Sequence, residues 1–405
     1  MRRSAALVTL AAFLGLPGQD ASAQATSLGD AVKKGKIKVA LRYRFETVRD
    51  DAVAEDAQAS TLRLALSYET LAWKRLAAFV QFENVTDLGL GDQHANGGAG
   101  SLNNGVQGRP VIADPEITQV NQALGRLATS RTKLEAGRFE WDLGNERFVG
   151  SVGWRQNHQS LDGGRIEQRL GGRAQASYAY LVGVNRVGGD RKRLDGHLVR
   201  GQFDAKPDLK LHATLLYLDY EEPADAGLSS FTFAGGVAGR HGLGAWALLF
   251  DAEAGWQKDA GENPRRVDEP YLRGELGLQR GRVTGRAGWE LLGGSLDPTR
   301  GAFGTPLATL HIWNGWADKF LTTPTAGLQD AWLSLGATFA KLRLLAVWHD
   351  FRAQDGDVRY GAEWDLLAAY ELPWKQQVAV KAGLYDADAF ARDTAKVWLY
   401  TSWGF

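Results

Sequence analysis

Charged side chains recur at every second position in several segments of the chain, and this is the spacing of groups on one face of a β-strand. In the segment 37–46, for example, Arg42 and Arg44 alternate with Tyr43 and Phe45. So many charges on one strand face cannot form a dry core, because each would need a buried partner. We therefore expect the charged faces to line water, where fixed charges can select among passing solutes.

The predicted inward-facing charges are of both signs in about equal number. They are Arg42, Arg44, Arg63, Arg200, Asp251, Glu253, Arg273, Glu275, Arg286, Glu290, Glu363, Asp365, Lys381 and Lys396. A second cluster is expected at a strand end and in the loop that follows it, comprising Arg138, Glu140, Asp142, Glu146, Arg147, Arg155 and Gln156. Opposed charges there would form a constriction with a transverse field. A network of salt bridges that stabilises the loop is equally compatible.

From these two groups we predict which residues line the lumen and set its selectivity. They are Arg42, Arg44, Arg63, Arg138, Arg155, Arg273, Arg286, Glu290, Glu363 and Asp365.

A connection at 293–329 is far longer than ordinary loops, and such loops are usually functional or disordered. Its aromatic residues favour an ordered structure. One hypothesis is that the loop folds over or into the lumen and gates it, and the other is that it forms an extracellular lid on neighbouring loops. The predicted gating residues are His311, Trp313, Trp316, Asp318, Lys319 and Phe320.

Other kinds of chemistry find little support in the sequence. The chain has no Cys, and its seven His include no pair at a metal-binding spacing such as HExxH, so we predict no metal site. Neither a G-x-S-x-G elbow nor a P-loop is present, and no nucleophile–base pair can be named, so we predict no enzyme activity and no cofactor. The 47 basic and 47 acidic residues give a net charge of zero, which argues against a nucleic-acid partner.

The elements that must position these residues are strands. The period-two pattern predicts an all-β chain of about eighteen strands (16–18), and the connections between them are alternately short and long. Short turns on one rim and long loops on the other are typical of a transmembrane antiparallel up-and-down β-barrel with periplasmic turns and extracellular loops. Aromatic residues near the strand ends suit the two girdles of such a barrel, and a soluble β-sandwich is the alternative.

The two ends of the chain predict its cellular location. Residues 1–23 have a basic start, an apolar run and an Ala-Ser-Ala triplet, so we predict a signal peptide there and a barrel over 24–405. The final strand ends in Phe405, as in barrels handed to the assembly machinery of the outer membrane. The predicted location is the outer membrane of a Gram-negative bacterium, in contact with lipid and lipopolysaccharide.

Three segments resemble those of the alginate export family of outer-membrane porins. They are Gly137–Asp162, Phe303–Asp330 and Tyr360–Asp365, and the first has Phe139 where the family pattern has Gln. The resemblance implies an eighteen-stranded barrel over essentially the whole mature chain.

We predict a channel for passive diffusion or export of polar, charged organic solutes. Two alternatives stay open: a dedicated exporter of an anionic polysaccharide such as alginate, and a non-conducting surface barrel. The mixed signs of the inward charges weaken the first alternative, since a polyanion conduit calls for a nearly continuous positive lining.

Overall fold

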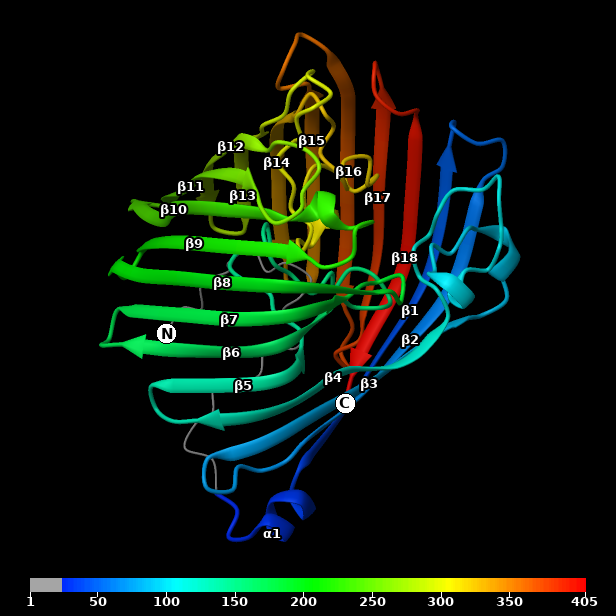
Figure 1. Cartoon of the computed structure of the whole chain (residues 1–405). Helices are drawn as coiled ribbons and strands as arrows, with labels where there is room; N and C mark the ends of the chain where they lie inside the picture. Colours follow the sequence, from blue (N-terminus) through cyan, green and yellow to red (C-terminus); the bar gives the residue numbers. More distant parts are fainter. Residues whose placement is uncertain (1–23) are drawn as a thin grey trace.

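The computed structural model describes residues 24–405, in which eighteen strands form one sheet that closes on itself (Figure 1). Neighbouring strands are antiparallel throughout, and β1 (Lys36–Asp50) hydrogen-bonds to both β2 (Ala57–Glu69) and β18 (Thr394–Gly404). Closure pairs the backbone groups that an open edge would leave unsatisfied in lipid. The predicted antiparallel up-and-down barrel of about eighteen strands is confirmed, and the predicted signal peptide (1–23) lies outside the described residues.

The remaining strands follow one another in chain order around the barrel. They are β3 (Leu76–Asp87), β4 (Ile117–Ala128), β5 (Thr132–Phe139), β6 (Ser160–Leu170), β7 (Ala174–Asn185), β8 (Arg191–Lys206), β9 (Leu209–Tyr220), β10 (Ser230–Leu243), β11 (Trp246–Asp259), β12 (Asp268–Arg280), β13 (Val283–Leu292), β14 (Leu328–Phe339), β15 (Leu342–Arg352), β16 (Arg359–Glu371) and β17 (Gln377–Ala387). The short helices are α1 (Leu28–Lys33), η2 (Gly91–Gln93), η3 (Gly100–Leu102), η4 (Ala226–Leu228) and η5 (Leu310–Ile312). In residues 24–405 no helix is long and apolar enough to cross a membrane.

Connections differ sharply in length between the two rims of the barrel. At one rim, which we call the turn rim, eight turns span two to six residues each. At the other, the loop rim, nine loops include the β3–β4 loop (88–116), the β5–β6 loop (140–159) and the β13–β14 loop (293–327). The terminal segment with α1 and the C-terminus both lie at the turn rim (Figure 1). This is the arrangement of outer-membrane barrels, whose turns are periplasmic.

Side chains alternate between an apolar outer wall and a polar inner wall. Leu276, Leu333 and Leu335 keep more than half of their surface exposed on the outer wall, whereas Glu253 and Glu290 are buried on the inner wall. An apolar outer wall of this extent is stable only in lipid. The chain is therefore an outer-membrane β-barrel, as the sequence predicts.

Two long loops fold into the barrel and pack on each other, and their apolar side chains pack against those of the strands in its buried core. Val149 of the β5–β6 loop and Leu307 of the β13–β14 loop form a parallel bridge, and Gly150 N donates to Leu307 O at 2.9 Å. Phe148 and Phe303 pack in the same buried cluster. The middle of the β13–β14 loop thus lies inside the barrel, as the first of the two hypotheses requires. Its ends pack on neighbouring loops, as the second requires: Arg266 N donates to Thr299 O at 3.2 Å, and Leu296 N donates to Asp355 Oδ2 at 2.9 Å.

Candidate functional site

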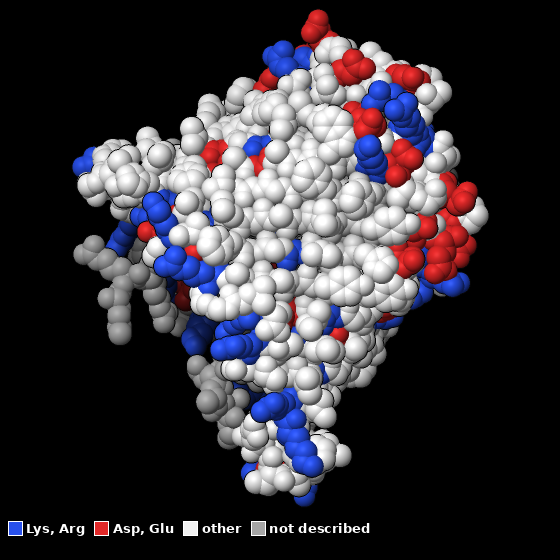
Figure 2. Space-filling view, turned by 60° about the vertical axis from the view of Figure 1, so that its left-hand side comes forward, with Lys and Arg blue, Asp and Glu red and all other residues white. Residues whose placement is uncertain are grey.

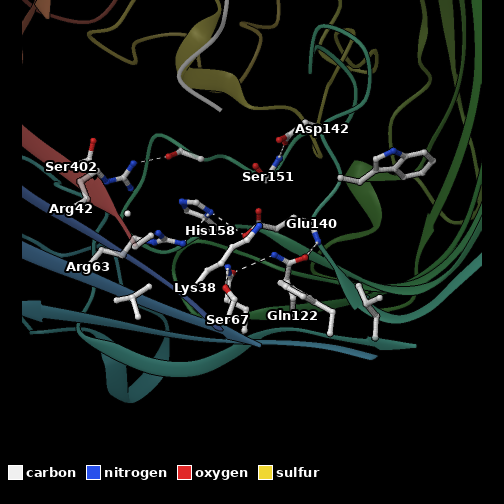
Figure 3. A pocket seen from close by; sticks show the side chains of 18 of the residues that line it. Lys38, Arg42, Arg63, Ser67, Gln122, Glu140, Asp142, Ser151, His158 and Ser402 are labelled. Carbon is white, nitrogen blue, oxygen red and sulfur yellow. Dashed lines mark hydrogen bonds and ion pairs between the residues drawn. The ribbon is translucent and has the colours of Figure 1, made fainter. Parts of the chain in front are cut away.

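A cavity of about 1120 Å³ lies inside the barrel between the turn rim and the β5–β6 loop (Figure 3). The inner faces of β1 to β8 and of β17 and β18 form its wall, and residues of the β5–β6 loop cover it. Lys38, Arg42, Arg63, Gln122 and His158 point into one shared space in Figure 3. The cavity opens toward the turn rim, where Lys36 and Phe405 line it.

Positive charge dominates the cavity lining. The basic residues are Lys36, Lys38, Arg42, Arg63, Arg126, Lys133, Arg165, Arg200 and Lys375, and the acidic ones are Glu140, Asp142 and Glu167. Nine basic against three acidic side chains concentrate anions, because walls of low dielectric focus the field of fixed charges. The near balance of signs expected from the sequence shifts toward positive charge at the surface of this cavity, although Glu69, Glu83 and Glu135 in the wall pair with three of its arginines.

Carboxylates in the wall hold several of the arginines in place. Glu135 on β5 is fully buried and accepts from Arg126 Nε and Arg165 Nε, both at 2.6 Å. On β2, Arg63 Nε and Nη2 donate to Glu83 Oε2 at 2.9 and 2.6 Å. Each guanidinium is thereby fixed in one orientation, and further donors bind the wall and the loop: Arg126 Nη1 pairs with Glu69, and Arg165 Nη1 donates to Glu140 O at 3.3 Å.

Arg42 and Arg44 on β1 bind the backbone of the β5–β6 loop. Arg42 Nη1 donates to Gly153 O and its Nε to Gln156 Oε1, both at 2.8 Å. Arg44 Nη1 donates to Trp154 O at 2.8 Å, and its guanidinium also pairs with Asp114 of the β3–β4 loop. Arg42 therefore lines the cavity and supports its cover, whereas Arg44 is buried behind the loop.

Glu140 and His158 form a polar corner of the cavity beside Arg63. Glu140 Oε1 lies 3.1 Å from His158 Nδ1, and Arg63 Nη2 lies 3.4 Å from the same nitrogen. Burial raises the pKa of Glu140 to about 7, although Arg63 and the Asn121 amide favour its charged form. Burial and Arg63 lower the pKa of His158 to about 3, so the pair is a hydrogen bond to a neutral imidazole and not an ion pair.

The β13–β14 loop is held across the lumen by Asp318. Its carboxylate binds His311 Nδ1 at 2.7 Å, Arg155 Nη2 at 2.8 Å and Lys396 Nζ at 2.9 Å. Burial opposes the charge of Asp318, but these three partners hold its pKa well below the usual range. Burial lowers the pKa of His311 well below its usual range, so the ring is neutral. His311 stacks on Trp154 of the β5–β6 loop with centroids 4.7 Å apart.

Acidic residues of the barrel wall bind the backbone of the same loop. Ala317 N donates to Glu363 Oε1 at 2.6 Å, and Trp316 N lies 3.2 Å from both oxygens of Asp365. Glu290 accepts from Arg147 Nη2 at 2.9 Å and from the Asn314 amide at 2.8 Å. Glu290, Glu363 and Asp365 thus hold the loop against the inner wall of the barrel.

The other predicted gating residues also contact the wall or its neighbouring loops. Trp313 lies 5.2 Å from the guanidinium carbons of both Arg147 and Arg273. Lys319 Nζ binds Asp50 at 2.6 Å. Phe320 is buried against Phe351, Tyr360, Tyr385 and Phe390.

The predicted selectivity residues therefore separate into groups. Arg42 and Arg63 line the cavity, while Arg44, Arg155, Glu290, Glu363 and Asp365 fix the two loops. Arg273 and Arg286 both pair with Glu275 on the inner wall. Arg273 Nη2 lies 3.6 Å from Glu275 Oε2, and Arg286 Nη1 is in closer contact with Glu275 Oε1.

Arg138 differs from the prediction, because it lies on the opposite face of β5 from Glu135 and Phe139. Its Nε donates to Asp162 Oδ1 at 2.7 Å, and Arg191 binds the other oxygen of the same carboxylate at 2.9 Å. Arg138 is thus on the outer side near the loop rim and is not a lumen residue.

Six basic residues of the cavity were absent from the predicted inward set. They are Lys36, Lys38, Arg126, Lys133, Arg165 and Lys375. Lys36 and Lys38 lie at the start of β1, Lys375 lies in the β16–β17 turn, and Arg126, Lys133 and Arg165 lie on β4, β5 and β6, of which β4 and β5 alternate weakly. The signal that could have found them is the continued period-two spacing, as in Lys133 with Glu135 and Arg165 with Glu167.

No family model and no curated protein sequence matches this chain. Solved structures do match: Pseudomonas aeruginosa OccK8 (OprE) has a TM-score of 0.72 at 15% identity, covering 93% of this chain and 99% of that one. Pseudomonas aeruginosa OpdK, solved with vanillate, has a TM-score of 0.72 at 14% identity over 92% and 99% of the two chains. Acinetobacter baumannii OccAB4 has a TM-score of 0.70 at 14% identity over 92% and 98%. These matches show that the chain has the fold of outer-membrane porins, and they give no support to the alginate export family in particular.

Proposed function

We propose that the protein is a passive outer-membrane channel for small anionic organic solutes, with carboxylates as the preferred class. The observation that carries the proposal is the cavity at the turn rim, where nine basic side chains face three acidic ones. A guanidinium such as that of Arg200, which lines the cavity and donates to the Thr214 hydroxyl, suits a carboxylate, because its forked donors match the two oxygens. The presence of vanillate, an aromatic carboxylate, in the OpdK structure supports the same solute class.

A dedicated polysaccharide exporter fits the geometry less well. The β5–β6 and β13–β14 loops meet inside the barrel through Trp154, His311, Arg155 and Asp318. A polymer could pass only if these buried contacts broke. A small solute needs only the space that remains beside them.

The same contacts favour a second candidate, a non-conducting surface barrel that its loops plug. Arg155 and Asp318 join the two loops by a buried ion pair at 2.8 Å, which resists opening. This candidate and the channel differ in one measurable property, the conductance of the purified protein.

Planar bilayers containing the purified protein separate the candidates. We expect discrete conductance steps and, in a KCl gradient, a reversal potential of the sign that marks anion preference. Uptake into proteoliposomes should be faster for benzoate than for benzylamine or benzyl alcohol, which have similar size. Absence of conductance would favour the plugged barrel, and cation preference would refute the proposed solute class.

A further inference from the structure

The segment around α1 forms a small amphipathic patch on the lipid side of the turn rim. Tyr68 lies on the outer face of β2, in line with Leu64 and Leu66, and its hydroxyl donates to Val32 O at the end of α1. Leu71 N also donates to Ala31 O at 3.1 Å, so α1 is bound to the β2–β3 turn (70–75). The helix is therefore fixed beside the outer wall, at the level where the membrane ends.

Apolar side chains of this segment are left without cover by the protein. Leu28 and Val32 are one helical turn apart and remain 61% and 51% exposed. Next to them on the rim, Ile37 and Leu76 are 67% and 50% exposed. These four residues continue the apolar outer wall of β1 to β3, which faces lipid along its length.

Four exposed cations accompany the apolar residues. Lys33 and Lys34 end α1, and Lys74 and Arg75 lie in the turn to which the helix is bound. Lys34 has an intramolecular partner, Asp30 at 2.8 Å, while Lys74 Nζ lies 4.8 Å from the centre of the Trp73 ring. In Figure 2 the blue side chains gather at the lower end of the molecule, around the protrusion that α1 forms.

This patch belongs to a rim at which exposed basic residues far outnumber exposed acidic ones. The exposed Lys and Arg at the turn rim of residues 24–405 are Lys33, Lys34, Lys36, Lys74, Arg75, Arg131, Arg169, Arg173, Lys206, Lys210, Arg240, Arg280, Arg282, Lys341 and Lys375. The exposed acidic residues there are Asp208 and Glu371. Basic groups beside apolar ones at a membrane boundary attract anionic headgroups, and long Lys and Arg side chains reach outward to them.

We propose that the patch formed by Leu28, Lys33, Lys34, Lys74 and Arg75 binds the phosphate headgroup of an anionic phospholipid in the periplasmic leaflet. The apolar side chains of α1 enter the boundary of the acyl region, and the four cations surround the phosphate. Continuity with the lipid-facing wall favours a lipid over an acidic protein as the occupant.

The test measures lipid binding to the delipidated protein in detergent by native mass spectrometry. The probes are phosphatidylglycerol, phosphatidylcholine and inorganic phosphate. We expect the wild type to bind phosphatidylglycerol at least tenfold more tightly than phosphatidylcholine. The K33Q/K34Q/K74Q/R75Q variant should lose most of this preference. The matched variant R49Q/R265Q/R352Q/R392Q removes four exposed cations at the loop rim and should keep it.

Each other outcome overturns the proposal. If both variants lost the preference for phosphatidylglycerol equally, the preference would come from the total charge of the protein and not from the patch. Competition by millimolar inorganic phosphate would indicate an anion site and not a lipid site. Unchanged lipid binding in the first variant would leave a protein as the occupant of the patch. The β-sheet signal in circular dichroism shows whether each variant is folded. Should the fourfold variant fail to fold, K33Q/K34Q is measured with R265Q/R392Q as its control.

Discussion

Glu140 carries the pH dependence that the cavity should show. Its pKa of about 7 means that the side chain is neutral below pH 7 and negative above it, while His158 with a pKa of about 3 stays neutral. A negative charge beside Arg63 offsets the positive field of the cavity. We expect the anion-to-cation permeability ratio to rise by a factor of roughly two between pH 8.5 and 5.5.

The variant E140Q should hold this ratio at its low-pH value throughout. Glu262→Gln, in the exposed loop between β11 and β12, is the matched control and should retain the pH dependence. Glu146 also has a pKa of about 7, from burial and the neighbouring Asp142. A pH response that persists in E140Q would therefore assign the effect to Glu146 and contradict the prediction.

Glu135 and Glu167 contact the same Lys133 but should contribute very differently to stability. Glu135 is fully buried among Arg126, Lys133 and Arg165, whereas Glu167 is partly exposed and lies 3.3 Å from Lys133. Removing a buried carboxylate leaves its cations unpaired. E135Q should lower the free energy of unfolding by about 3 kcal/mol, and E167Q by less than about 1 kcal/mol. Urea unfolding in lipid vesicles measures both, and equal losses would show that burial does not decide the difference.

Residue types alone could predict that charges line the lumen, but not which of them lie at the cavity and which are buried behind a loop. Arg42 and Arg44 stand two positions apart on β1, yet one lines the cavity and the other is buried beneath Trp154. The difference comes from the β5–β6 loop, about 110 residues away along the chain. The prediction for Arg138 is wrong because β5 has too few alternating residues to show which positions face inward. An error of one residue in this alternation moves a side chain from the inner wall to the outer wall.

At the scale of elements, strands could be predicted because their two faces meet different solvents and impose a period of two. The loops have no such periodicity. Their position inside the barrel depends on contacts such as that between Asp318 and Arg155. These two residues are 163 positions apart in the sequence, so no local pattern can predict that they meet. The sequence could show that the β13–β14 loop is long and aromatic, and only the structure shows which groups bind it.

Asp318 is the group whose loss should free that loop. Asp318→Asn removes the charge that binds Arg155, Lys396 and His311, while keeping the size of the side chain. We expect a single-channel conductance higher by a factor on the order of two, with more frequent current fluctuations. Asp297→Asn in the same loop is the control, because Asp297 is exposed and bonds only locally, to Thr299. Identical currents from both variants would mean that this ion-pair cluster does not hold the passage narrow.

At the scale of the whole molecule, a net charge of zero conceals a division of charge between the two ends. The turn rim and the cavity above it are basic, while exposed acidic side chains such as Asp51, Glu221, Glu262 and Asp388 lie at the loop rim. An overall balance therefore says little about selectivity, since a permeating ion responds to the charges of the lumen within about one Debye length, ~8 Å at physiological ionic strength.

Anion preference should accordingly depend on lumen charge and not on total charge. Lys38 and Arg200 line the cavity, and Arg200 Nη1 donates to the neutral Thr214 hydroxyl at 2.9 Å. The buried carboxylate near Arg200, Glu253, keeps its contact with His212 at 3.0 Å, so K38Q/R200Q lowers the positive charge without leaving that carboxylate unpaired. We expect this variant to lower the anion-to-cation permeability ratio by a factor of roughly two in 0.1 M KCl, and by less in 1 M KCl, where screening is stronger. R265Q/R352Q makes the same change in total charge at the exposed loop rim and should leave the reversal potential unaltered. If both variants shifted the reversal potential equally, the field of the whole surface would control permeation, and the cavity would lose its assigned role.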